Sequence, residues 1–348
     1  MKVRNLPVPI WKRKQYAEKI VEEKGSKAKK EHLNSVGTAV SEELCKKILW
    51  YKYPKNLIDV VKEKAGAAPP PVPLGPSDFE EDGRMKTTSI ERCIDRVYPG
   101  ALSHATLRKA VLGVLSDEGL NYANTYFGCS RAPMEACRIF DGDWMFPNDY
   151  VNIGGLGGLP FGGRHAFHSL LKHVPDSCCL LMLMSTHTGF DPAGNLGFVQ
   201  RLDEKTMQVS PPLQTCMAPM KAFRILLEEP EYELNKVEQE DRQYKYIFNL
   251  IKQNFDHISE CDFVTEGIGR VLLQKTRSTI LKYLGESKLA QNMIVVLLTG
   301  TQIETPSGMS DYFAVTDIEI RRGARPEDLK SYKEKLKYFI DREHLSQH

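Results

Sequence analysis

The chain has 348 residues, of which 26% are charged, and a formal net charge of +2. This length suits one large α/β domain with an extension, or two domains, and the near-neutral balance gives no support for nucleic-acid binding. The longest apolar run, residues 178–184, is far shorter than the roughly 20 residues that cross a bilayer, so we expect no transmembrane segment.

The eight cysteines are spread along the chain. A secreted disulfide framework is typically short and dense in cysteine, so this pattern indicates free thiols in a reducing compartment, mitochondrial or cytoplasmic. The N-terminus also lacks the continuous apolar core of a secretory signal. We therefore expect a protein that is not secreted.

The N-terminal quarter of the chain, residues 1–88, differs in composition from the rest. Residues 1–31 hold ten Lys and Arg against four Glu, and residues 1–66 are expected to form a basic helical arm. Its charge indicates either an acidic partner or a solvated helix face. Residues 67–88 are Pro-rich and then acidic, which predicts an extended linker. The remainder is expected to form a domain over 89–325 and a helical tail over 326–348.

From residue 89 onward the pattern is that of an α/β domain. Helical spacing alternates with short apolar runs that are rich in strand-forming residues, and such alternation predicts a mainly parallel or mixed sheet flanked by helices. Functional sites in such sheets gather where strands end and loops begin. In chain order, helices are expected at 89–99, 107–119, 163–173, 231–259 and 264–284, and strands at 122–129, 177–187, 292–305 and 311–320.

A Gly-rich stretch, "GGLGGLPFGGRHAF", spans residues 154–167. A dinucleotide-binding G-x-G-x-x-G that starts at Gly155 would need glycine where Pro160 stands. A Walker loop would need Lys and Ser or Thr where Arg164 and His165 follow. The glycines instead indicate tight turns and close approach to another group, either a neighbouring strand or a small ligand.

Three possible metal ligands stand next to predicted element ends. Cys129 and His187 fall at the ends of predicted strands, and Cys216 comes just before a helical segment. Two thiolates and one imidazole would leave a fourth zinc position for water, which is the arrangement of a catalytic site. Nothing resembles a C-x-x-C pair, and the alternative is a metal-free core in which these side chains are simply buried.

The same stretches resemble a known family. "YPGALS" (98–103), "GGLGGLPFGG" (154–163), "HVPDS" (173–177), "THTGFDPAGNLGFVQR" (186–201) and "LLTGTQIETPSGMSDYF" (297–313) are similar to the limiting-CO2-inducible protein B/C family, whose fold is akin to β-class carbonic anhydrases. The resemblance covers roughly residues 95–322 and leaves the arm unmatched. It implies a dimer and a Zn²⁺ site on Cys129, His187 and Cys216. It also implies a pocket for CO2 or a small anion that includes Gly157, Gly158, Phe161, Gly162 and Asp191.

This chain departs from the family pattern next to Cys129. The family reads approximately Cys-x-Asp-Glu there, and its Asp pairs with an Arg to control the zinc-bound water. Here Arg131 stands two places after the cysteine, and a guanidinium only donates hydrogen bonds and stays charged. Glu135 or Asp141 is a possible substitute for the acid. Arg138 or Arg201 is a possible remaining half of the pair.

Two functional hypotheses follow from the resemblance. One is a zinc-binding relative with impaired CO2 hydration that serves as a subunit of a larger assembly, docked through residues 1–88. The other is an active zinc carbonic anhydrase that interconverts CO2 and bicarbonate. The missing acid and the N-terminal arm favour impaired catalysis, whereas the intact Gly-rich stretch and "HTGFD" indicate a retained pocket.

Overall fold

The structure is a computed structural model that describes residues 87–132, 150–176, 178–200, 202–203, 208–211, 213–306, 309–322 and 329–346. The chain divides into two units, Met1–Lys64 and Ala65–His348, and every described residue belongs to the second. The predicted arm over 1–66 and all but the last two residues of the predicted linker lie outside the described part. Among the helices in that part, none is long and apolar enough to span a membrane.

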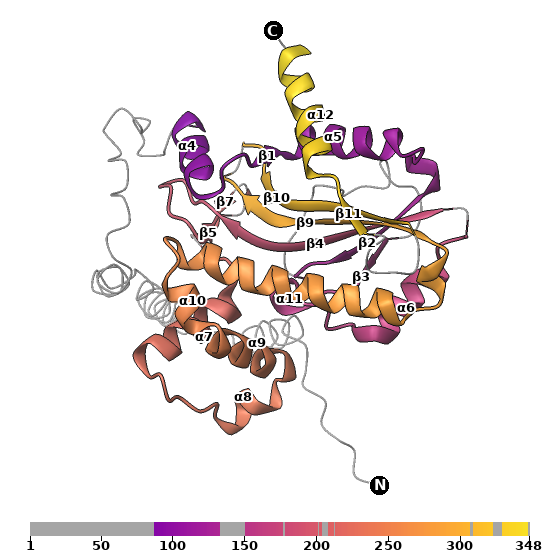
Figure 1. The fold of residues 1–348 in the computed structure, drawn as a ribbon. Coiled ribbons are helices and arrows are strands. Elements are labelled where there is room, and N and C mark those ends of the chain that lie inside the picture. The colour runs from indigo at the N-terminus through magenta and orange to yellow at the C-terminus, as the bar shows by residue number, and fades with distance from the viewer. Residues whose placement is uncertain are drawn as a thin grey trace, which may run out of the picture. The chain divides into compact units, whose positions relative to one another are not determined.

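A mixed seven-stranded sheet organises the domain, as the sequence predicts (Figure 1). Its strand order is β1-β10-β9-β4-β2-β3, with β11 also paired to β10. Strands β3, β2, β4 and β9 run parallel, and β10 runs antiparallel to β9. The strands are β1 Leu102–Ser103, β2 Thr125–Ser130, β3 Tyr150–Asn152, β4 Cys179–Gly189, β9 Ile294–Glu304, β10 Tyr312–Arg322 and β11 Leu329–Ser331.

Helices and short ladders surround this sheet. The helices are α4 Thr87–Val97, α5 His104–Asp117, α6 Gly163–Lys172, α7 Met217–Glu228, α8 Lys236–Glu240, α9 Arg242–Gln253, α10 Phe255–Ser259, α11 Val264–Glu286 and α12 Lys333–Ser346. Single 3-10 turns are η2 Tyr122–Asn124, η3 Leu156–Gly158 and η4 Leu289–Gln291. Two small ladders pair β5 Phe198–Val199 with β8 Leu213–Gln214, and β6 Leu202–Asp203 with β7 Gln208–Val209.

The central strand β4 is buried on both faces. Leu181 and Leu183 belong to the core beneath α5 and α12, whereas Leu180 and Met182 belong to the core beneath α6 and α11 (Figure 1). Successive strand side chains point to opposite faces, so a strand that is covered on both sides must be apolar at every position. This is why "SCCLLMLMSTH" predicts a buried strand without any alternation.

Two expected elements differ from the structure because of capping residues. The helix expected over 231–259 is divided into α8, α9 and α10. The Asp241 side chain accepts hydrogen bonds from the backbone N–H groups of Gln243 and Tyr244, which begins α9 as a separate helix. Likewise, Asn121 caps η2, so the strand expected from residue 122 begins only at Thr125.

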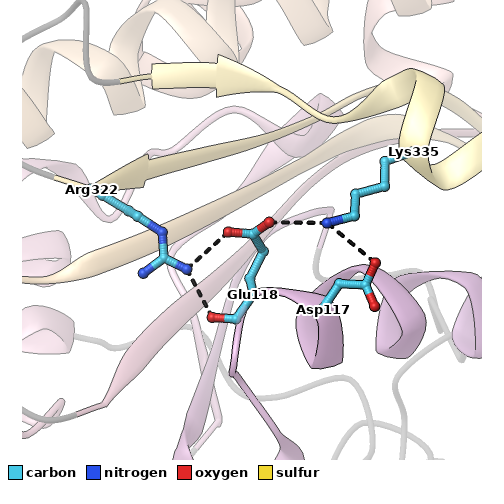
Figure 2. Close-up of polar contacts among 4 residues, drawn as sticks. All are labelled: Asp117, Glu118, Arg322 and Lys335. Carbon is cyan, nitrogen blue, oxygen red and sulfur yellow. Dashed lines mark hydrogen bonds and ion pairs between the residues drawn. The ribbon is translucent and has the colours of Figure 1, made fainter.

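The C-terminal segment completes the α5 face of the sheet. Helix α12 lies along α5 so closely that a Cβ added at Gly113 would be 2.6 Å from the ring of Phe339. Figure 2 shows the ion pairs at its base, where Lys335 Nζ lies 3.1 Å from Glu118 Oε1 and 3.3 Å from Asp117 Oδ2. Arg322 contacts the other Glu118 oxygen at 3.0 Å. Partial burial by itself would raise the pKa of Glu118, but these two cations hold that pKa below its ordinary value.

Candidate functional site

The candidate site lies where β4 extends beyond its neighbour β2. Ser130, the last residue of β2, pairs with Met184, while β4 continues to Gly189. The β5–β8 ladder occupies the place beside these last residues. The Gly197 N–H donates to the Gly189 carbonyl at 2.8 Å, and the Thr215 N–H donates to the Gly197 carbonyl at 2.8 Å. This ladder brings the start of α7 to the exposed edge of β4.

His187 and Cys216 are therefore in direct contact. The Cys216 backbone N–H donates to His187 Nε2 at 3.2 Å, and the Cys216 thiol donates to the His187 carbonyl at 3.1 Å. Both residues are 7% exposed. Because Nε2 accepts a hydrogen bond, this geometry assigns the imidazole as neutral, with its proton on Nδ1.

Cys216 adopts a left-handed backbone conformation, with φ 50° and ψ 39°. It is the single non-glycine residue with positive φ in the part of the chain that the structure describes. This conformation costs a residue with a side chain about 1–2 kcal/mol. The two hydrogen bonds to His187 offset that cost, and the sharp reversal turns both the N–H and the thiol of Cys216 toward the same histidine.

Glu304 faces the other nitrogen of the imidazole. Its Oε1 lies 3.8 Å from His187 Nδ1, and both side chains are largely buried. The register of β4 against β9 explains this contact. His187 pairs with Gln302, and Glu304 follows Gln302 by two residues, so the side chains of His187 and Glu304 lie on the same face of the sheet. Sequence reasoning missed Glu304. The signal that could have found it is a carboxylate at the end of a predicted strand, because strand ends at this edge of the sheet also hold His187.

Cys129 does not join the pair. It pairs with Leu183, four residues before His187, which corresponds to ~13 Å along a strand. Its side chain is fully buried in the core beneath α5, and its thiol donates to Asn152 Oδ1 at 3.3 Å. Over the described ranges, no group of three or more His, Cys, Asp and Glu side chains is placed to hold a metal ion. The structure thus brings together two of the three predicted ligands.

The segment that contains Arg131 is fixed by Asn152. The Asn152 amide accepts from the Arg131 N–H at 3.3 Å and from the Gly154 N–H at 2.9 Å, and it donates to the Arg131 carbonyl at 3.4 Å. A Cβ at Gly154 would overlap the Arg131 backbone. Arg131 therefore follows β2 in a defined position. The other predicted candidates, Glu135, Asp141, Arg138 and Arg201, lie outside the described residues.

The Gly-rich stretch approaches a strand, which was one of its two expected neighbours. Gly157 and Gly158 have positive φ, and a Cβ at Gly158 would overlap the Ser185 carbonyl of β4. The Ser130 hydroxyl donates to the Gly158 carbonyl at 2.7 Å. Of the other predicted pocket residues on this stretch, Phe161 packs edge-to-face on Tyr246, and Gly162 donates its N–H to the Ile153 carbonyl.

Asp191, the remaining predicted pocket residue, holds a turn. Its carboxylate accepts from the Ala193 N–H at 2.9 Å, from the Asn195 N–H at 2.8 Å and from the Asn195 side-chain amide at 2.9 Å. It is 3% exposed. This turn sends the chain back to Gly197 and β5. Asp191 thus stabilises the turn before β5, and the β5–β8 ladder places Cys216 next to His187.

Two further buried groups set the electrostatics nearby. Burial, followed by the negative charge of Glu266, raises the pKa of Tyr98 well above its ordinary value, so its phenol stays protonated. Burial and the charge of Arg108 lower the pKa of His104 to about 4. Tyr98 and His104 are therefore both neutral near neutral pH.

The sheet has a parallel centre and helices on both faces, and a His–Cys pair lies at the carboxyl end of its parallel strand β4. This arrangement is that of a β-carbonic-anhydrase-like α/β protein. Residues 102–322 match the family described as "Limiting CO2-inducible proteins B/C beta carbonic anhydrases", and the chain belongs to that family. A comparison with curated proteins gave no match.

Solved structures of this family share the fold. PtLCIB4, a homolog of the limiting CO2-inducible protein LCIB, superposes with a TM-score of 0.58 at 23% identity, covering 67% of this chain and 96% of that one. A point mutant of PtLCIB4 gives a TM-score of 0.59, also at 23% identity, over 68% of this chain and 95% of that one. LCIB itself gives 0.51 at 12% identity, with coverage of 68% and 95%.

Proposed function

We propose that this chain is a carbonic-anhydrase-like protein of the limiting-CO2-inducible B/C type in which CO2 hydration is impaired. The observation that carries the proposal is Arg131, which follows β2 at the position where the family resemblance implies an acid. The acid that the resemblance implies would accept a hydrogen bond from the group that adds to CO2, and a guanidinium has no acceptor atom. Losing a positioned base or orienting group typically costs ~10²–10⁴ in rate.

Arg131 can serve a different purpose at this edge of the sheet. Its charge is permanent, and its planar fork of donors matches the geometry of a carboxylate-like oxyanion. The segment after β2 is anchored by Asn152, so the guanidinium starts from a fixed backbone. We propose that Arg131 holds a small anion, such as bicarbonate, rather than promoting its formation.

We propose that the chain binds zinc with lower affinity than a three-ligand site does. His187 Nε2 and the Cys216 sulfur are ordinary zinc donors, and a metal bound by them would displace the Cys216 N–H from Nε2 and the thiol from the His187 carbonyl. Cys129 lies ~13 Å further back along the strand direction. The described residues therefore fit two of the three protein ligands of a catalytic zinc site, and no step through the metal is assigned. With two donors, the chain is expected to hold zinc less tightly than a three-ligand site does.

Metal analysis of single variants tests the zinc proposal. Purified full-length chain should retain less than ~0.5 zinc per chain after dialysis, because a two-donor site cannot retain the metal against buffer. Cys216→Ser should abolish the zinc that remains, whereas the matched variant Cys129→Ser should leave it unchanged. Full occupancy that Cys129→Ser abolishes would show a three-ligand site and overturn the proposal.

Stopped-flow CO2 hydration tests the catalytic part. The zinc-loaded chain should be indistinguishable from buffer, and Arg131→Asp should raise hydration by ~10² or more because it restores an acceptor. Arg131→Gln is the control, since it removes the charge without supplying a carboxylate. A wild-type rate well above buffer would identify the active carbonic anhydrase instead. An unchanged rate in a zinc-loaded Arg131→Asp variant would exclude Arg131 from the orienting position.

We further propose that the protein works as a subunit of a larger assembly, docked through residues 1–88. This proposal is supported by sequence alone, through the basic arm and the Pro-rich, acidic linker. In a native extract the full chain should migrate with large partners, and a chain that lacks residues 1–88 should not. Migration as a free dimer that is unchanged by this deletion would contradict the proposal.

A further inference from the structure

Glu304 is placed to act on His187 although it lies 117 positions away in sequence. It is the last residue of β9, and the parallel register with β4 puts its side chain on the same face as that of His187. Its exposed side-chain fraction is 14%, and that of His187 is 6%, so neither group is strongly solvated. The distance from Glu304 Oε1 to His187 Nδ1 is 3.8 Å.

The two nitrogens of His187 have different surroundings. Nε2 accepts from the Cys216 N–H, which leaves the imidazole proton on Nδ1, the nitrogen that faces the carboxylate. At 3.8 Å the contact is about 1 Å longer than a charge-assisted hydrogen bond. Contacts of this kind often tighten when a site is occupied.

We propose that Glu304 is a positioning residue for His187. Its carboxylate fixes the neutral imidazole with the proton on Nδ1, and thereby keeps the Nε2 lone pair directed at Cys216. Histidines that bind metals commonly donate their second ring N–H to a carboxylate, which orients the ring and raises its basicity. The inference rests on the proposed function only for its metal-binding consequence, because the tautomer exists without any metal.

Gln302 is the alternative orienting group. It pairs directly with His187 across the two strands, it is 1% exposed, and its amide faces the His104 imidazole. An amide is neutral and can turn either its oxygen or its nitrogen toward the ring, so it does not select one tautomer. The carboxylate of Glu304 only accepts and does select one.

Imidazole ¹⁵N NMR on the metal-free full chain tests the proposal near neutral pH. The chain has nine histidines. The signals of His187 are assigned as those that disappear in the variant His187→Gln. Wild type should show His187 with Nδ1 protonated and Nε2 bare. Glu304→Ala should raise the fraction of the Nε2-protonated tautomer, which only the Cys216 N–H then opposes. Glu304→Gln should give an intermediate pattern, because its amide can present either its oxygen or its nitrogen to the ring.

Two controls keep the result specific. Thr305→Val is nearly isosteric and removes the hydroxyl contacts of the adjacent residue with Ser310 and Asp311 without touching the ring. It should leave the His187 signals unchanged. A Glu304→Ala spectrum identical to wild type would overturn the proposal, as would a tautomer that responds to Gln302→Leu and not to Glu304→Ala.

Zinc competition against a chromophoric chelator separates this inference from the proposed function. Glu304→Ala should weaken zinc binding by about 10–100-fold, and Glu304→Gln by clearly less. If the tautomer responds to Glu304 while the wild-type chain binds no zinc at all, positioning is supported and the metal site is rejected. If zinc binds and neither the tautomer nor the affinity responds to Glu304, the positioning role is rejected and the metal site is supported.

Discussion

Gly158→Ala tests how the Gly-rich stretch contributes to the site. Gly158 has φ +76°, and an added Cβ would overlap the Ser185 carbonyl of β4. The left-handed conformation costs alanine about 1–2 kcal/mol relative to glycine. Overpacking against a strand backbone that is buried on both faces adds about 1–3 kcal/mol. The free energy of unfolding should therefore fall by ~2–5 kcal/mol.

Gly163→Ala provides the matched control. Gly163 has φ +71°, nearly the same conformation, but nothing lies within 4 Å of an added Cβ. It should lose only the conformational part, about 1–2 kcal/mol. Urea denaturation of both full-length variants, followed by far-UV circular dichroism, measures the difference. Equal stabilities for the two variants would refute the conclusion that Gly158 is required for close approach to β4.

Three further predictions concern Lys335, Glu118 and His104. Lys335→Ala should destabilise the fold by about 1 kcal/mol through loss of its contacts with Asp117 and Glu118, while Lys337→Ala on the exposed side of α12 should have little effect in the same denaturation assay. Because the folded pKa of Glu118 is lowered, the stability it contributes is present above its unfolded pKa and is lost as pH falls through the folded value, and Glu118→Gln should remove that pH dependence. His104 has a folded pKa of about 4, against 6.5 when unfolded, so the wild type should lose up to about 3 kcal/mol between pH 6.5 and 4. His104→Asn should flatten this loss, His173→Asn should not, and a wild-type stability that stays constant across the window would contradict the buried neutral histidine.

The sequence predicts most of the fold because a strand that is buried on both faces has a continuous run of apolar residues. The apolar runs at 177–187 and 292–305 became β4 and β9, the two central strands. The boundaries that were wrong lie at polar caps. Asp241 interrupts a pattern whose helical period continues past it, and Asn121 stabilises a turn where strand-forming residues begin. In both places a side-chain hydrogen bond to the backbone overrides the periodicity.

The candidate site is less visible in sequence. His187 and Cys216 were candidates from their places next to predicted element ends, and the family resemblance then pointed to the same residues. The register of β2 against β4 pairs Cys129 with Leu183, four residues before His187. This separation also depends on where β2 ends. Glu304 reaches the imidazole only because β9 runs parallel to β4 in a particular register. Neither strand register can be inferred from the amino-acid sequence alone.

The sequence by itself determined the mixed sheet and its helical covering, because composition and local periodicity carry that information. That an arginine stands where an acid is expected follows from the family resemblance. Only the tertiary structure decided which side chains meet. Strand register and the left-handed turn at Cys216 set distances of a few ångströms between residues far apart in the chain. Those distances arise from packing the whole sheet and not from any one segment.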